Sequence, residues 1–118
     1  MADTEIILVD GPVTRERLRE IAKLRFGDLV KAVVDIEKGV MAIGGELHSD
    51  EEAFLLERES AQKGLWGINI YPDRVGNEMV EFDSMINVRP SQNNRSRSVE
   101  GSALREKILE IVNKLVIG

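Results

Sequence analysis

The sequence predicts an α+β domain: a two-layer sandwich in which three helices cover one face of a mainly antiparallel sheet. Two pairs of β-rich runs joined by short turns predict the sheet, and three segments with apolar residues at helical spacing predict the helices. The 118 residues, 42% of them hydrophobic and 31% charged, have the size and composition of one globular domain. We therefore expect residues 1–118 to form a single domain with the order β-α-β-β-α-β-β-α.

The first strand and the first helix are expected near the start of the chain. An apolar run at residues 6–9 is followed by Asp-Gly-Pro, a sequence typical of a turn after a strand. Thr14 is a good helix N-cap, and Gly27 suits a helix end. The apolar spacing between them predicts a helix over residues 15–26.

A β-hairpin is expected next. Runs rich in β-branched residues at 30–37 and 40–47 flank Lys38-Gly39, which has the composition of a two-residue turn. With that turn, Asp35 pairs with Ala42 across the hairpin.

The remaining helices are predicted by a cap and by an apolar stripe. Ser49 and Glu52 have the spacing of a capping box, which predicts a short helix over residues 50–58. A stripe of Leu, Ile and Val predicts the last helix over residues 102–116.

A second hairpin lies between these two helices. Residues 65–71 and 79–89 both have the composition of strands, and a turn-like segment separates them. The stretch 90–99 is almost free of apolar residues and is expected to be a loop. Trp66 falls on the apolar face of its strand, which predicts a core position.

Strand alternation divides the expected sheet into an apolar face and a polar face. The polar face is predicted to carry Asp35, Glu46, Asn69, Asp83, Asn87 and Arg89. With all helices on the apolar face, these side chains would meet solvent, a ligand or a second subunit. Solvated charges, a ligand site and a homodimer interface are therefore three alternative interpretations.

The loop at residues 89–97 is the least ordinary stretch of the sequence. It holds three arginines and no acidic residue in a chain of formal net charge −5. Guanidinium groups bind phosphate and carboxylate with two parallel hydrogen bonds, and amide side chains add neutral donors. The anion-binding residues predicted here are Arg89, Gln92, Arg95 and Arg97. The alternative is a polar loop that pairs with the acidic stretch at 46–59.

Two further candidate chemistries rest on His48, the single histidine. Together with Glu46 it could contribute to a metal site, which would suit a metal-assisted hydrolase. A Ser-His arrangement would need Ser84 or Ser91, but the sequence contains no Gly-x-Ser-x-Gly elbow. The absence of cysteine excludes a thiol nucleophile and thiolate metal sites. The sequence assigns no catalytic residue and no cofactor.

Charge and hydropathy also limit the partners. The sequence pI of about 5.0 and the scarcity of aromatic residues argue against nucleic acid and anionic membranes. No apolar run approaches the roughly 18 residues of a membrane span. The chain start lacks the basic and apolar regions of a signal peptide, so a cytoplasmic location is expected.

Two stretches carry a resemblance to a known family. AVVDIEKGVMAIGGELH at 32–48, and WGINIYP with EFDSMINVRPSQNNRSR within 66–97, resemble a small prokaryotic domain family of unknown function. The resemblance covers most of the chain and implies a stand-alone intracellular protein, with no particular activity.

Taken together, the sequence favours a domain that binds a small anionic or phosphorylated ligand on an open polar sheet face. A homo-oligomeric or partner-binding module and a metal-assisted hydrolase are the alternatives.

Overall fold

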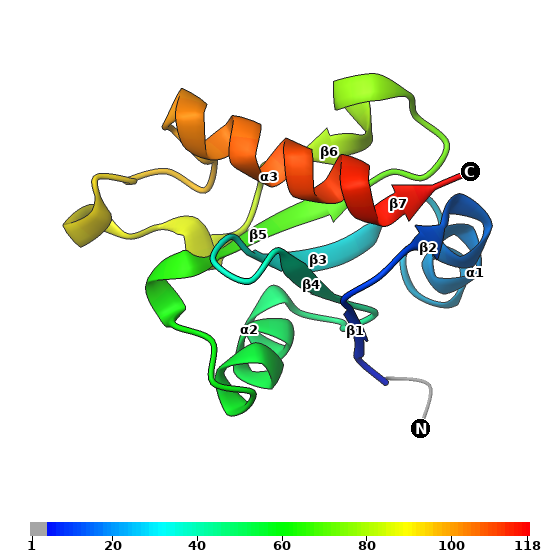
Figure 1. Cartoon of the computed structure of the whole chain (residues 1–118), viewed down its shortest axis with the longest axis horizontal. Coiled ribbons are helices and arrows are strands. Elements are labelled where there is room, and N and C mark those ends of the chain that lie inside the picture. Colours follow the sequence, from blue (N-terminus) through cyan, green and yellow to red (C-terminus); the bar gives the residue numbers. More distant parts are fainter. Residues whose placement is uncertain (1–4) are drawn as a thin grey trace.

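A computed structural model describes residues 5–118 of the chain (Figure 1). The first four residues, which contribute to the expectation that no signal peptide is present, lie outside this range. Within residues 5–118, none of the helices is both long enough and apolar enough to cross a membrane.

Three α-helices and seven short strands make up the regular structure of the described residues. The helices are α1 (Arg15–Arg25), α2 (His48–Glu57) and α3 (Ser102–Leu115). The strands are β1 (Ile7–Val9), β2 (Val13–Thr14), β3 (Val30–Asp35), β4 (Val40–Ile43), β5 (Leu65–Ile70), β6 (Val80–Glu81) and β7 (Val116–Ile117). The 3₁₀ turns are Gln62–Gly64, Gly76–Met79, Met85–Asn87 and Pro90–Gln92.

The main sheet of the described chain has the strand order β1-β4-β3-β5-β6, and every neighbouring pair is antiparallel. The predicted α+β class and mainly antiparallel sheet are therefore confirmed. The sequence did not predict β2 and β7, which form a separate two-stranded parallel pair. This pair joins the segment before α1 to the end of α3.

One face of the sheet packs against α1 and α3. Apolar side chains of both helices, such as Leu18 and Ile108, join Ala32, Val34 and Ile68 in one buried core. Trp66 belongs to the same core and is almost fully buried, as its strand position predicted.

Helix α2 covers the opposite face, so the prediction that all helices share one face is wrong (Figure 1). Its Leu55 packs with Val33, Ala42 and Leu65, and Phe54 lies against the same cluster. These strand residues alternate with those of the first core and therefore point the other way. The domain consequently has three layers, and this second face is partly covered.

The β3–β4 hairpin has a longer turn than predicted. Asp35 pairs with Val40 and Val33 with Ala42, whereas the two-residue turn would have paired Asp35 with Ala42. The register differs by two residues. Because side chains alternate with a period of two, each strand residue keeps its predicted face.

The two predicted helix caps have different outcomes. Thr14 caps α1 as predicted, since its hydroxyl accepts a hydrogen bond from Arg17 N at 3.0 Å. The capping box predicted at Ser49 is wrong, because α2 begins at His48 and its N-cap is Leu47. Leu47 has no side-chain acceptor, so the first turn of α2 is uncapped by its own N-cap side chain.

The predicted long strand at 79–89 is also wrong. Only Val80 and Glu81 pair with β5, and the chain then leaves the sheet through the 3₁₀ turn Met85–Asn87. The segment from Asp83 to Arg97, which we call the return loop, folds back so that Ser84 N donates to Arg97 O at 3.0 Å.

Candidate functional site

The residues predicted for the polar sheet face are mostly buried and engaged in internal hydrogen bonds. Asp35 is 1% exposed and accepts hydrogen bonds from Glu37 N at 2.9 Å, Lys38 N at 3.0 Å and Ser60 Oγ at 2.6 Å. Both carboxylate oxygens are therefore used to hold the hairpin turn and the loop after α2. Asp35 supports the fold and is not available to a ligand.

Asn87 is fully buried and takes the place of a neighbouring strand beside Gly67. Its Oδ1 accepts from Gly67 N at 2.8 Å, and its Nδ2 donates to Gly67 O at 2.9 Å. Nδ2 also donates to Arg97 O at 2.9 Å. The amide is fully occupied in joining the return loop to β5.

Arg89 is also used by the fold. Its guanidinium donates to the backbone oxygens of Ile86 and Gln62 at 2.9 Å and of Leu65 at 2.5 Å, and it contacts Glu52 Oε2 at 3.5 Å. Four of its five N–H groups are thus directed at acceptors. Only one remains for an external anion, although the sequence predicted Arg89 as a principal ligand.

The rest of the predicted anion loop is organised around Asn94. This buried amide donates to the backbone oxygens of Asn87, Ser96 and Ser98, and its Oδ1 accepts from Glu100 N at 2.8 Å. No local pattern in the sequence distinguishes Asn94 from the other amides of the loop.

The remaining predicted residues lie at several places on the surface. Gln92 is exposed and donates to Lys63 O at 3.1 Å, and Arg95 and Glu46 are also exposed. Asn69 donates to Glu81 Oε1 at 2.9 Å. Asn69 Oδ1 is one of the buried polar atoms that find no hydrogen-bond partner within residues 5–118.

One small cleft does bring several predicted residues together. It opens where α2 begins beside the return loop and has a volume of about 160 Å³. Its lining comprises Lys31, Leu47, His48, Ser49, Ser84, Met85, Ile86 and Arg97. We call this site the His48 cleft. Of the residues predicted for a ligand or a metal, His48 and Arg97 line it, and Asp83 is bonded to Arg97.

His48 is held in a defined orientation within the cleft. The side chain is 8% exposed, and its Nε2 lies 2.8 Å from Ile68 O. Because a carbonyl only accepts, Nε2 must carry a proton, and in the neutral ring Nδ1 is then an acceptor. Burial lowers the pKa of His48, and Lys31 and Arg97 act in the same direction, while Ile68 O and Asp83 oppose them. At neutral pH the ring is therefore uncharged.

Gly67 provides the space in which His48 and Ser84 approach the sheet. A Cβ added at Gly67 would lie 2.6 Å from both Cβ and Oγ of Ser84 and 3.2 Å from His48 Cδ2. These contacts are closer than van der Waals packing allows. The lack of a side chain at Gly67 thus lets the two polar residues form the inner part of the cleft.

Two cationic side chains line the cleft together with the histidine. Arg97 donates through Nε to Asp83 Oδ1 at 2.6 Å, which fixes the guanidinium at the edge of the cleft. Lys31 comes from β3, and its ammonium lies 5.0 Å from the centre of the Phe26 ring. Lys31 was not among the residues predicted for a site, so its place in the cleft was missed.

A buried carboxyl lies one turn into α2. Glu51 is fully buried; its Oε2 accepts from Gly45 N at 2.9 Å, and Oε1 has no partner within the described chain. Burial raises the pKa of Glu51 well above its ordinary value, although Gly45 N and Lys31 offset part of this effect. The sequence predicted only a helix-capping segment here.

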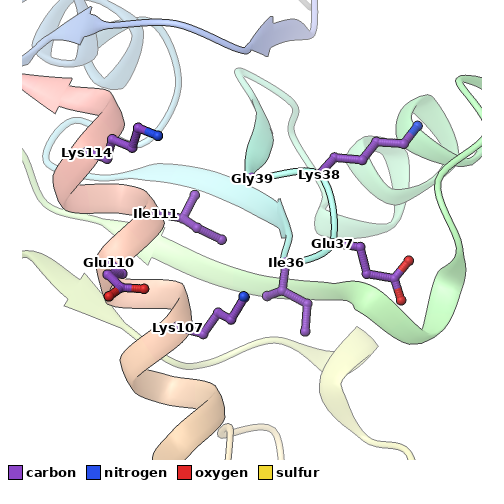
Figure 2. Close-up of a pocket in the computed structure, with 8 residues that line it drawn as sticks. All are labelled: Ile36, Glu37, Lys38, Gly39, Lys107, Glu110, Ile111 and Lys114. Carbon is purple, nitrogen blue, oxygen red and sulfur yellow. The ribbon is translucent and has the colours of Figure 1, made fainter.

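A larger depression of about 420 Å³ lies between α3 and the β3–β4 turn (Figure 2). Ile36 and Ile111 form its apolar part, and its exposed charges are of both signs. Figure 2 shows Glu37 and Lys38 directed away from α3, and Lys38 Nζ donates to Arg58 O at 2.9 Å. None of its lining residues is buried, so it lacks the convergent polar groups of a preformed site.

For the predicted metal site, the described residues offer no further ligand beside His48 and Glu46. Within residues 5–118, no three His, Asp or Glu side chains converge closely enough to hold a metal ion. Glu46 is exposed on the surface, whereas His48 is buried with one ring nitrogen bonded to the backbone.

The fold and the cleft define an α+β domain in which an antiparallel sheet lies between two helical layers, with a small polar cleft at the start of α2. Over residues 7–115 the chain matches the model of a family described as protein of unknown function (DUF5674), and it belongs to that family. No curated protein and no solved structure matches the chain.

Proposed function

We propose that this domain binds a small anionic ligand in the His48 cleft. The observation that carries the proposal is that Lys31 and Arg97 line the same cleft as the buried His48 ring. Each cation lies close enough to depress the pKa of the histidine, so their fields overlap within the cleft. An anion placed there would be attracted by both.

The local positive charge is notable because the chain as a whole is acidic, with a formal net charge of −5. The uncapped first turn of α2 adds backbone N–H groups at the same place, and helix N-termini attract anions. Asp83 neutralises part of the charge on Arg97. We therefore expect weak to moderate affinity for a simple anion.

The neutral histidine adds a preference for the form of the anion. Nδ1 accepts a hydrogen bond, while Lys31 and Arg97 can only donate. A ligand that carries both a charged oxygen and an O–H group, such as hydrogen phosphate, would satisfy all three side chains. The hydroxyls of Ser49 and Ser84 can donate or accept and would complete the shell.

Calorimetric titration with inorganic phosphate at low ionic strength tests the proposal. The wild-type chain should bind one phosphate, and Arg97→Gln should weaken binding by about tenfold, since a charge-assisted hydrogen bond contributes about 1.5–3 kcal/mol. Arg95→Gln is the matched control, because it removes the same charge from an exposed site two residues away that is not part of the cleft lining.

Equal weakening by the two substitutions would show that only the net charge matters. That result, or the absence of any binding, would contradict the His48 cleft as an anion site.

A further inference from the structure

The rim of the His48 cleft differs chemically from its inner part. The buried residues are the polar His48 and Ser84, whereas the most exposed lining residues include the apolar Leu47 and Met85. Leu47 is 53% exposed and Met85 is 65% exposed. Two large apolar side chains thus extend into solvent beside one polar cleft.

These apolar residues come from two different elements. Leu47 immediately precedes α2, and Met85 begins the 3₁₀ turn after β6, so separate segments bring them to the same opening. Ile86, which follows Met85, also lines the cleft and packs partly against the apolar cluster beneath α2. The rim therefore continues the apolar surface from the core to solvent. Met side chains adapt readily to ligands of different shape.

The size of the cleft limits what can enter it. Pockets that enclose a whole drug-sized ligand have volumes of about 300–1,000 Å³, whereas the His48 cleft has about 160 Å³. A charged head group of a few atoms fits inside, but any substituent must leave through the opening. That substituent would then lie on Leu47 and Met85.

We infer that the ligand is an amphiphilic anion, a compact phosphate-like or carboxylate head group bearing an apolar substituent of a few carbon atoms. This inference rests on the proposed anion site and names the class of ligand it takes. The head group binds between Lys31 and Arg97, and the substituent removes apolar area of the rim from water. The chain's net charge of −5 opposes docking onto an anionic membrane, so the ligand is a free molecule.

The test compares inorganic phosphate with n-butyl phosphate by calorimetry. Butyl phosphate should bind about tenfold more tightly, because the equivalent of slightly less than two fully buried methylene groups leaves water. In Leu47→Ala, which cannot cap α2, and in Met85→Ser this gain should shrink to about threefold or less, while the affinity for inorganic phosphate is retained. Val75→Ser is the control, since Val75 is 74% exposed and is not part of the cleft lining.

The possible outcomes distinguish the anion site from the apolar rim. If neither compound binds, the anion site itself is contradicted. If both bind with equal affinity, the anion site stands and the apolar rim is contradicted. Co-sedimentation of the wild-type chain with vesicles containing phosphatidic acid would overturn the assignment to a free ligand. The expected result is no co-sedimentation under conditions in which butyl phosphate binds.

Discussion

Asn87 binds both backbone groups of Gly67, accepting from the N–H at 2.8 Å and donating to the carbonyl at 2.9 Å. A side chain thereby takes the position that the next strand would occupy, just where the expected second strand of the hairpin leaves the sheet. The same amide holds Arg97 O, so it connects β5 with the residue that contributes a cation to the His48 cleft. The fold and the cleft thus depend on one buried amide.

Substitution of Asn87 should therefore be strongly destabilising. Asn87→Ala leaves the buried N–H and carbonyl of Gly67 without these partners, which should cost about 3 kcal/mol in free energy of unfolding. Asn113→Ala, on the exposed side of α3, should change it by less than about 0.5 kcal/mol. Urea denaturation measures both. Similar values for the two variants would show that the amide is dispensable.

Gly67 should not tolerate even a methyl group. In Gly67→Ala the new Cβ would clash with Ser84 at 2.6 Å, and we expect a loss of about 2 kcal/mol. Adding Ser84→Gly removes the clashing atoms, so the double variant should lose less than the sum of the single variants. At Gly11 nothing lies within 4 Å of an added Cβ, which makes Gly11→Ala the control for loss of glycine. Strict additivity in the thermodynamic cycle would count against the contact.

The buried carboxyl of Glu51 should make stability depend on pH. Since its pKa is raised in the folded state, the fold holds this proton more tightly than the unfolded chain does. The contribution of Glu51 is fully present below the unfolded pKa, about 4.3, and is lost as the pH rises through the folded pKa.

Glu51→Gln removes this titration, so the wild-type minus variant difference in unfolding free energy should fall as the pH rises. The slope should be at most about 1.4 kcal/mol per pH unit. Urea denaturation at intervals of about one pH unit, from roughly pH 4 to pH 9, measures this difference. Glu57→Gln, at an exposed position in the same helix, is the matched control for replacing a glutamate by glutamine. Parallel curves for wild type and Glu51→Gln would contradict the assignment.

The pKa of His48 should respond to its charged neighbours. Arg97→Gln removes a positive charge and should raise the pKa, whereas Asp83→Asn removes a negative charge and should lower it. Because the chain has a single histidine, one NMR titration of the ring carbons gives each pKa without assignment. Identical pKa values in the three proteins would show that neither Arg97 nor Asp83 acts on the ring.

Local periodicity accounts for most of the correct sequence predictions. The helix over Arg15–Arg25 and the helix over Ser102–Leu115 each end within one residue of their expected limits. Strand alternation also placed the residues of β3, β4 and β5 on the correct sides of the sheet, although the hairpin register differs by two residues. These features depend on the spacing of neighbouring residues, which a single sequence contains.

The predictions that were wrong concern features that depend on contacts between residues far apart in the sequence. The sequence offered one unused signal for the position of α2: Val33, Ala42 and Leu65 are apolar residues on the face that was expected to be polar and open. A strand that is apolar on both faces indicates cover on both sides. No local pattern, however, shows that Arg89 would bind backbone carbonyls from a segment 24 to 27 residues away.

Ring ¹⁵N NMR of His48 during a phosphate titration tests the anion site most directly, because the His48 side chain lines the cleft. The wild-type chain should show a saturable change in the Nδ1 signal, with the same change in Arg95→Gln and a much weaker one in Arg97→Gln. An unchanged His48 signal at saturating phosphate, or an equal response in Arg97→Gln, would contradict the account.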